Sequence, residues 1–480
     1  MFLPVNHVVF LLRWYFPHSI GPLKAAAFVS YNMAAPEPSR CCFFVQKKKR
    51  FCKMVAGKGR KYCGEHATME EDGSGSRRIV CPLDPKHTVS EDKLQKHLKK
   101  CNSREKAKPV YFVENINAGS ADGDETLRQV SLSELSRTEL ETLVDKLKTA
   151  FKGLQCDLED SVQSHPALHH ELHNPKNGDS AHKHLKQQSS ILGHMEELGL
   201  LGRGRCFVEF GAGRGKLSHW IHEALKTCEH LKTCEDLQLL LVERCSTRFK
   251  VDGKHQDAGV QFERLQVDIQ HLDLSKVPLL CEKKLPLVGV GKHLCGAATD
   301  LALRCLLETA GQSEEEEPPH KRLRPSEPSE PRSGGGLRSA PTGCGPGPVL
   351  GLTVALCCHH RCDWRHYVGQ QFFLQRGLGA REFSAFCRMS SWATCGLRPT
   401  NQRGDGEEHE PAEETDAVNG FLSASEREQL GRLCKQLIDH GRCHFLQMKG
   451  FSSKLTRYIS SDVTLENVLL TAVPLTPHSS

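Results

Sequence analysis

The sequence lacks a long uninterrupted hydrophobic run, which argues against a membrane-spanning helix. Its apolar N-terminal stretch, residues 8–16, is short, is interrupted by Arg13 and is not followed by a clear cleavage site. We therefore expect neither an export signal nor a membrane partner. Met33 is followed by two alanines and resembles an alternative translation start, so we expect residues 1–39 to form a disordered extension outside the folded protein.

Two internal segments lack the large apolar side chains that a folded core needs. Residues 311–348 are rich in Glu, Pro, Ser and Gly, and residues 400–419 are acidic. Such segments bury too little apolar surface to offset the conformational entropy lost on folding. We predict that both are disordered insertions, and that a chain of 480 residues with 38% hydrophobic content folds as separate parts.

Cysteine and histidine are abundant, with 22 cysteines and 26 histidines in the chain. They recur at the spacings of metal ligands, and no convincing export signal precedes them, so a reducing compartment fits better than a secreted disulfide framework. This pattern leaves both the cytoplasm and the nucleus open. The net charge of +6 is uneven: between Arg40 and His66, nine basic residues stand against one acid, which predicts contact with a polyanion.

The stronger of two expected metal sites combines two cysteines with two histidines. Its members are Cys81, His87, His97 and Cys101. The spacing C-x5-H-x9-H-x3-C supplies four zinc ligands, and the last two are spaced to share one face of a helical turn. The surrounding segment, residues 78–105, is too small to fold on buried apolar area alone, so we expect a CHHC zinc finger there.

A second four-ligand set lies upstream, in residues 40–68. Its members are Cys41, Cys52, Cys63 and His66, with Cys42 as an alternative to Cys41. Basic and aromatic side chains alternate between these ligands: Lys47, Lys48, Lys49, Arg50, Lys58, Arg60 and Lys61 with Phe43, Phe44, Phe51 and Tyr62. Cations for phosphates and aromatic faces for bases favour RNA binding by a CCCH zinc finger. The other interpretation is that at least two of these aromatic side chains form the small core of the finger.

Residues 128–156 are expected to be helical. Leucines at positions 132, 135, 140, 143 and 147 recur at roughly helical spacing, with charged residues between them. The pattern covers two or three heptads, so it fits either a coiled-coil linker or an amphipathic helix that packs on its own domain. It does not identify a protein partner.

The largest folded part is expected over residues 180–475. A helical pattern over residues 183–201 ends at Gly202 and Gly204. The apolar runs expected to form strands are residues 206–210, 239–242, 262–267, 286–290 and 349–356. Their alternation with helical segments predicts a doubly wound α/β fold with a parallel sheet. Two further runs, residues 443–448 and 463–472, are expected to add an antiparallel hairpin.

A glycine-rich turn follows the first of these strands. The turn contains Glu209, Gly211, Gly213 and Gly215, and acidic residues Glu243 and Asp268 follow the next two strands. The spacing E-x-G-x-G-x-G differs from the G-x-G-x-x-G of dinucleotide enzymes and allows close backbone approach to a methionine moiety. The acid after the second strand can accept the ribose hydroxyls of a cofactor, and the third acid can meet its adenine. Each acid alone fits a helix cap, but together they predict an S-adenosylmethionine site in a Rossmann-like class I methyltransferase domain behind two zinc fingers.

These segments, together with residues 292–300 and 355–369, closely resemble the eukaryotic tRNA 2'-O-methyltransferase family that modifies the fourth nucleotide of the acceptor stem. The resemblance covers both fingers in the same order and the region from about 180 to 473. The second finger also resembles the CHHC finger of a minor-spliceosome protein, which supports contact with RNA. The resemblance implies methyl transfer from S-adenosylmethionine to a ribose 2'-hydroxyl of tRNA, with zinc in the fingers.

Lys292 and His293 are the candidate catalytic residues for that reaction. They closely follow the fourth expected strand, so they can reach the carboxyl edge of the sheet, where ligands bind. A ribose hydroxyl is a poor nucleophile until its proton is removed or its developing charge is stabilised. Lys292 could orient this hydroxyl, or act as a base if burial lowered its pKa.

A cysteine- and histidine-rich run after the fifth strand has two interpretations. The run contains Cys357, Cys358, His359, His360 and Cys362. It could be a third metal site, although adjacent ligands in a strand point to opposite faces, or a polar loop of the substrate pocket. Asp300 likewise fits either the N-cap of the following helix or a catalytic acid.

Two other functions compete with this hypothesis. One is methyl transfer to a base, another RNA or a protein, since a fold does not choose its acceptor. The absence of an Asn-Pro-Pro-Tyr type motif after the fourth strand argues against exocyclic amines as acceptors. The other is a noncatalytic zinc-finger RNA-binding protein, against which the complete set of glycines and acids argues.

Overall fold

The computed structural model describes residues 39–46, 50–57, 59–63, 66, 78–101, 103–104, 108–119, 130–154, 157–226, 237–245, 260–309, 346–395 and 422–475. Apart from residues 39 and 346–348, the expected N-terminal extension and the two expected insertions lie outside this part of the chain. The contacts divide the chain into two units, Met1–Ala107 and Lys108–Ser480. Among the described residues, no helix combines the length and the hydropathy that crossing a membrane requires.

The N-terminal unit contains two small antiparallel ribbons. β1 (Phe44–Val45) pairs with β2 (Arg50–Phe51), and β3 (Arg78–Cys81) pairs with β4 (Asp84–Ser90). The second ribbon is followed by the 3-10 turn η3 (Glu91–Lys93) and the short helix α1 (Leu94–Leu98). Both ribbons belong to segments that the sequence analysis assigned to zinc fingers.

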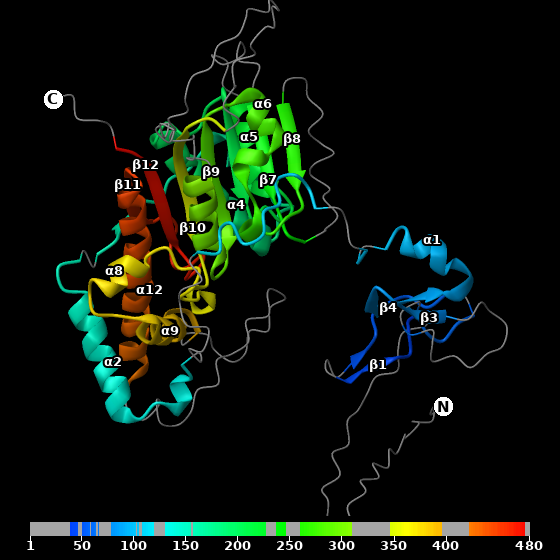
Figure 1. Ribbon diagram of the computed structural model, residues 1–480, viewed down its shortest axis with the longest axis horizontal. Helices are drawn as coiled ribbons and strands as arrows, with labels where there is room; N and C mark the ends of the chain where they lie inside the picture. The colour runs from blue at the N-terminus through cyan, green and yellow to red at the C-terminus, as the bar shows by residue number, and fades with distance from the viewer. Residues whose placement is uncertain are drawn as a thin grey trace, which may run out of the picture. The chain divides into compact units, whose positions relative to one another are not determined.

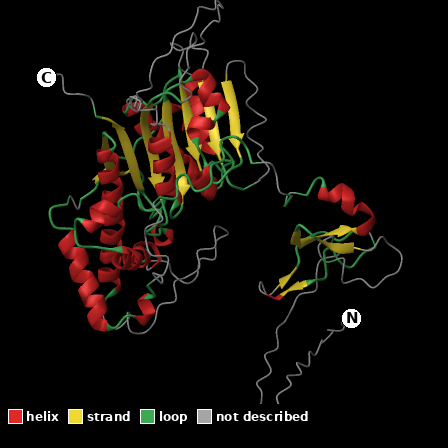
Figure 2. Cartoon of the chain, in the orientation of Figure 1, coloured by secondary structure: helices red, strands yellow, loops and turns green. Residues whose placement is uncertain are grey.

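The second unit is built on one sheet of eight strands. These are β5 (Glu159–Asp160), β6 (Arg205–Phe210), β7 (Leu237–Val242), β8 (Val260–Leu265), β9 (Leu287–Leu294), β10 (Val349–Leu356), β11 (Phe451–Arg457) and β12 (Val468–Pro474). The strand order is β5-β11-β12-β10-β9-β6-β7-β8 (Figures 1 and 2). The five strands from β10 to β8 are parallel, and β12 is antiparallel to both β10 and β11. The predicted α/β fold with a mostly parallel, Rossmann-like sheet is confirmed.

Helices cover both faces of this sheet. The helices of the second unit are α2 (Arg137–Ala150), α3 (His169–Leu172), α4 (Asp179–Glu197), α5 (Lys216–Lys226), α6 (Pro278–Lys283), α7 (Ala298–Arg304), α8 (Gln370–Leu374), α9 (Ala380–Met389), α10 (Trp392–Cys395) and α12 (Ala424–Met448). Single turns are η4 (Leu132–Glu134), η5 (Pro166–Leu168), η8 (Ile269–His271), η9 (Leu274–Lys276), η10 (Cys305–Thr309) and η11 (His359–Arg361). Apolar residues of α4 and α5 pack on one face, and those of α6, α7 and the end of α12 pack on the other.

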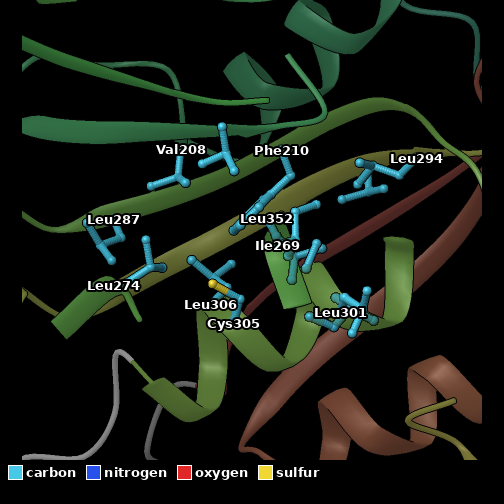
Figure 3. Packing of buried hydrophobic residues seen from close by; sticks show 14 of the residues in the cluster. Val208, Phe210, Ile269, Leu274, Leu287, Leu294, Leu301, Cys305, Leu306 and Leu352 are labelled. Atoms are coloured by element: carbon cyan, nitrogen blue, oxygen red, sulfur yellow. The ribbon is translucent and has the colours of Figure 1, made fainter. Parts of the chain in front are cut away.

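Alternating side chains along the strands contribute to the apolar clusters on both faces of the sheet. In β7, Leu239 and Leu241 belong to one apolar cluster, whereas Leu240 and Val242 belong to the opposite one. Successive side chains of a strand point to opposite faces, so a strand buried on both sides must be apolar throughout. Figure 3 shows part of the cluster to which Leu240 and Val242 belong. In it, Leu306 lies close to residues of the central strands.

A third apolar cluster joins α2, α8, α9 and the first half of α12, which lie side by side in Figure 1. The buried face of α2 contains Leu140, Leu143 and Leu147. Two ion pairs tie this helix to α9: Lys146 Nζ lies 2.7 Å from Glu382, and Arg381 lies 3.0 Å from Glu139. This packing agrees with the second interpretation of the leucine pattern, an amphipathic helix on its own domain.

One expected strand is wrong: residues 443–448 are the last turns of α12. This helix starts with a capping box in which the Ser423 hydroxyl accepts from the Glu426 backbone N–H and the Glu426 carboxylate accepts from that of Ser423. Its buried positions recur at helical spacing up to Leu446, because the helix continues from its cap through this run. A six-residue apolar run does not by itself distinguish strand from helix. The hairpin exists, but β11 and β12 form it.

Candidate functional site

The glycine-rich turn lies at the carboxyl end of β6, at the point where the strand order reverses between β6 and β9. Gly211, Gly213 and Gly215 all adopt positive φ angles, of 63°, 50° and 72°. A Cβ atom on Gly211 would lie 2.8 Å from Leu294 Cδ2 at the end of β9, so a larger residue does not fit. α5 begins one residue after the turn and directs its N-terminus toward this edge, which is where open α/β sheets bind ligands.

Glu209 is buried at the end of β6 and connects the turn to α5. Its carboxylate accepts hydrogen bonds from the Ser218 backbone N–H, at 3.0 Å, and from the Ser218 hydroxyl. Burial raises the pKa of Glu209 to about 7, while the bonds from Ser218 and the positive charges of Arg264 and Lys292 act in the opposite direction. Glu209 therefore links β6 to α5, the two elements on either side of the glycine turn.

Glu243 and Asp268 follow β7 and β8 and lie at the same edge of the sheet. Glu243 accepts a hydrogen bond from the Gly213 N–H at 2.9 Å, so the second acid touches the glycine turn directly. Asp268 caps the 3-10 turn η8 by accepting from the Gln270 N–H at 3.1 Å. An adenosyl cofactor needs close approach of the backbone and acceptors for its hydroxyl groups. This edge of the sheet offers backbone N–H groups and conformationally free glycines for the first need and half-buried carboxylates for the second.

Lys292 and His293 belong to the last residues of strand β9 and do not follow it. Lys292 pairs with Ala355 and Leu294 pairs with Leu356, so His293 is an extra, unpaired residue of β9 at a β-bulge. Its φ angle of 65° is rare for a residue with a Cβ, and such strain tends to occur at functional sites. The bulge redirects adjacent side chains that would otherwise point to opposite faces, and Lys292 Nζ lies 2.7 Å from His293 Nε2.

His184, which the sequence analysis did not single out, completes this group. It lies on α4, and its Nδ1 atom is 3.2 Å from Lys292 Nζ. Solvent reaches the side chain of His293, yet its packed surroundings lower its pKa to about 4, and the charges of Lys292 and His184 add to this effect. The imidazole of His293 is therefore neutral near pH 7. The cluster of Lys292, His293 and His184, called here the Lys292 cluster, offers three nitrogen atoms beside the glycine turn.

Asp300 is neither an N-cap nor exposed to a ligand. It lies inside α7, whose N-cap is Ala297, and is fully buried. Arg442 of α12 donates to both of its carboxylate oxygens, at 3.1 and 2.6 Å, and also donates to Asp439 at 2.9 Å. Asp300 therefore pairs with an interior cation; the N-cap interpretation is wrong, and this buried ion pair argues against a role as catalytic acid.

The cysteine- and histidine-rich run after β10 is divided between two environments. His359 Nε2 lies 2.7 Å from Asp439, and Cys362 lies 3.3 Å from Arg442, so both belong to the buried charge network around Arg442. Cys357 and Cys358 lie instead next to Cys295, which follows β9. The five residues do not form one metal site.

In the second zinc finger, the four expected ligand atoms converge. Among Cys81, His87, His97 and Cys101, the atoms lie 3.1 to 3.8 Å apart in the pairs that are in contact. A tetrahedral zinc ion with bonds of about 2.0 Å to nitrogen and 2.3 Å to sulfur separates its ligands by about 3.3 to 3.8 Å. The donor set fits zinc. Cys101 lies beyond the end of α1, so it reaches the site from a turn after the helix.

In the first zinc finger, Cys41, Cys52, Cys63 and His66 place their ligand atoms within 4.8 Å of one another. His66 Nδ1 is 3.4 Å from Cys41 Sγ and 3.3 Å from Cys63 Sγ, while Cys42 is exposed and outside the group. Phe43 stacks on the His66 ring and Phe44 packs edge-on against Phe51, which makes these aromatic residues part of the small core. Lys47, Lys48, Lys49 and Lys58 lie outside the described residues.

The second finger also carries a basic hollow beside its ligands. Arg78, Lys93, Lys96 and Lys100 line a shallow pocket together with His97. The three lysines are exposed, on or next to α1. Several cations around one concavity suit the closely spaced phosphates of a nucleic acid backbone.

Family comparisons match all three folded segments of this chain. The family described as Methyltransferase TRM13 matches residues 186–473. A CCCH zinc finger in TRM13 protein matches residues 39–67, and a U11-48K-like CHHC zinc finger matches residues 78–102. The matches follow the order of the two ligand sets and the sheet.

Curated relatives share almost the full length of the chain. A protein of Mus musculus named tRNA:m(4)X modification enzyme TRM13 homolog is 52% identical over 484 residues, which cover 95% of this chain and 99% of the relative. Its Homo sapiens counterpart is 53% identical over 472 residues, 93% of this chain and 96% of the relative. The tRNA:m(4)X modification enzyme TRM13 of Yarrowia lipolytica is 31% identical over 444 residues, 88% and 87% of the two chains. Because the methyltransferase match covers more than half of the sequence and the relatives extend over nearly all of it, the chain belongs to the TRM13 methyltransferase family.

Proposed function

We propose that this protein transfers a methyl group from S-adenosylmethionine to the ribose 2'-hydroxyl of the fourth nucleotide in the tRNA acceptor stem. The relatives are named tRNA modification enzymes, which supports tRNA as the substrate. The observation that carries the choice of a hydroxyl acceptor is the Lys292 cluster. It provides nitrogen atoms, rather than the amide and aromatic groups that hold an exocyclic amine, next to the glycine turn.

The methyltransferase family implies S-adenosylmethionine, whose sulfonium supplies an electrophilic methyl group when it is bound. Gly211 and Gly213 allow the backbone to approach the methionine part closely. We assign Glu243 to the ribose hydroxyls and Asp268 to the adenine edge, because these acids follow β7 and β8 in order away from the turn. Glu209 holds the turn through Ser218.

Lys292 is the residue that we assign to the reacting hydroxyl. In this proposal its Nζ atom contacts the 2'-oxygen, orients it toward the methyl group and stabilises the negative charge that develops as the hydroxyl proton passes to solvent water. His293 and His184 position Lys292 from two sides, at 2.7 and 3.2 Å. A neutral His293 accepts a hydrogen bond from the Lys292 amine and adds no competing positive charge at pH 7.

The two fingers are assigned to RNA binding, over residues 40–68 and 78–105. Zinc held by each four-ligand set folds segments that lack a core of their own. The basic hollow of Arg78, Lys93, Lys96 and Lys100 then binds acceptor-stem phosphates. Phosphate contacts fix register and orientation, so the fingers select the shape of the stem while the second unit presents the methyl group.

The test is transfer of a labelled methyl group from S-adenosylmethionine to unmodified total tRNA, with Gly213→Asp as the inactive variant. An aspartate at Gly213 would be strained by the positive φ and would add a second negative charge next to the Glu243 carboxylate, which accepts from the backbone N–H of this position. Gly153→Asp is the matched control, because Gly153 also has a positive φ, of 80°, but nothing lies near its Cβ position. Label in tRNA with the wild type and Gly153→Asp, and none with Gly213→Asp, supports the proposal. Label in protein or in other RNAs, with none in tRNA, would overturn it.

A further inference from the structure

Three cysteine thiols meet at the carboxyl edge of the sheet and have no role in the proposed reaction. Cys295 follows β9, and Cys357 and Cys358 follow the neighbouring strand β10. The Cys295 sulfur is 3.6 Å from each of the other two sulfurs, which are 3.2 Å apart. Cys357 and Cys358 are buried and Cys295 is half-buried. This arrangement is called here the thiol triad.

The backbone explains how two consecutive cysteines face the same point. Along a regular strand their side chains would point to opposite faces. β10, however, ends at Leu356, and Cys358 adopts φ −22° and ψ 80°, which is not an extended conformation. The Gly296 N–H donates to the Cys358 carbonyl at 3.2 Å, and this bond holds the loops after β9 and β10 together. The objection that sequence spacing raised against metal binding therefore does not apply to this pair.

We propose that the thiol triad binds one zinc ion, separate from the two zinc ions of the fingers. Three thiolates bound at about 2.3 Å to one tetrahedral ion lie about 3.8 Å apart, so small side-chain adjustments bring the three sulfurs to a common centre. Thiolates select zinc and softer ions over magnesium or calcium. The described residues group no fourth metal-binding side chain with these three.

Three protein ligands leave the fourth position of zinc to water or to an oxygen of the substrate, as in catalytic rather than structural zinc sites. The triad begins three positions after Lys292, on the same side of the switch point as the Lys292 cluster. An ion there joins the ends of β9 and β10, the two strands whose loops frame the proposed acceptor site. Zinc binding at the triad does not depend on the acceptor being tRNA.

The zinc content of the full chain, purified with zinc under reducing conditions, tests this inference. We expect three zinc ions per chain for the wild type and two for the double variant Cys295→Ser with Cys358→Ser. Cys281→Ser is the matched control, because Cys281 is also half-buried but contacts a backbone carbonyl outside the triad. It should retain three ions. Circular dichroism verifies that each variant is folded.

Cadmium exchange gives a second measurement that does not rely on a triad variant. In a full chain with Cys63→Ser and Cys101→Ser, which weaken both finger sites, cadmium bound to the triad should still produce a thiolate charge-transfer band with one ion per chain. Two zinc ions in the wild type, or no residual cadmium band in the finger variant, would overturn the inference. Neither measurement uses methyl transfer, so failure of the proposed function and failure of this site are distinguishable.

Discussion

At the scale of single residues, one inserted position shapes the proposed catalytic centre. His293 is the bulged residue of β9, and the bulge places its ring beside the amine of Lys292. A regular strand would have buried one of these side chains in the layer below the sheet. His184 reaches the same amine from α4. The three nitrogen atoms thus meet only because a strand irregularity and a helix face the same edge.

Replacing Lys292 tests this arrangement. We predict that Lys292→Ala lowers the rate of methyl transfer by at least about 100-fold, the usual loss when a group that stabilises the charge of the transition state is removed. The dissociation constant of S-adenosylmethionine should stay within about twofold, since the proposal assigns the cofactor to other residues. Single-turnover kinetics and calorimetry measure the two quantities.

Lys276→Ala is the control for Lys292→Ala, because Lys276 is a surface lysine that forms an ion pair with Asp273 at 3.0 Å. Asp273 is buried but keeps its hydrogen bonds from the Ser275 backbone N–H and hydroxyl, and neither Lys276 nor Asp273 is assigned to the reaction, so the rate of Lys276→Ala should match the wild type. If Lys292→Ala transferred methyl groups at the wild-type rate, Lys292 would have no role in the reaction.

Because its carboxyl group is buried, Glu209 should make the unfolding free energy of the protein depend on pH. Its pKa is about 7 in the folded protein because of burial and close to 4.5 when unfolded, so the folded state binds the proton more tightly. The stabilising contribution is present below pH 4.5 and is lost as the pH rises through 7. A shift of this size corresponds to at most about 3 kcal/mol of unfolding free energy. Urea unfolding without cofactor should therefore show Glu209→Gln gaining stability relative to the wild type between pH 5 and pH 8.

The exposed Glu282, on α6, provides the control variant Glu282→Gln, for which we expect the same pH profile as the wild type. Parallel profiles for the wild type and Glu209→Gln would show that the Glu209 carboxylate is not the titrating group.

At the scale of elements, the fingers and the sheet depend on different stabilising interactions. The sheet buries strands such as β7 completely between two helical layers. The second finger has one ribbon and the five-residue helix α1, and the buried apolar residues of this segment are its two cysteine ligands and Val89. Such a segment depends on its metal for a defined fold.

We predict that His97→Ala removes one zinc ion per chain and weakens tRNA binding by about tenfold or more, because the lysines on and next to α1 to which we assign the phosphates lose their fixed positions. Binding of S-adenosylmethionine should not change. Fluorescence anisotropy with labelled tRNA and calorimetry with the cofactor measure both. Ser103→Ala, which removes only a hydrogen bond to Asp84, is the control. Equal losses of both affinities in His97→Ala would contradict the assignment of this finger to RNA.

Sequence patterns predicted the parts of the site that are local in the chain. The glycine turn, the acids after successive strands and both ligand sets could be recognised because each is defined by spacing within a short segment or by its place after a strand. His184 and Lys292 are 108 positions apart, and no local pattern predicts their contact. Asp300 was misassigned for the same reason, since its partner Arg442 comes from α12.

At the scale of the whole molecule, the strand order explains how distant segments form one site. Between β6 and β9 the order reverses, so the glycine turn after β6 and the Lys292 and His293 side chains of β9 occupy adjacent positions at the same edge. The N-terminal unit contributes zinc-binding segments and basic residues, and the second unit contributes the sheet and its clusters. The proposed division of labour is substrate binding by the first unit and methyl transfer by the second.

The position of the methyl group on the tRNA is the most direct test of the central claim. A ribose 2'-O-methyl group blocks alkaline cleavage of the adjoining phosphodiester, because that cleavage requires a free 2'-hydroxyl. An end-labelled tRNA treated with the protein and S-adenosylmethionine should therefore show one missing band at the fourth nucleotide after alkaline hydrolysis. A complete ladder from tRNA that carries the transferred methyl group would place methylation on a base and contradict the account.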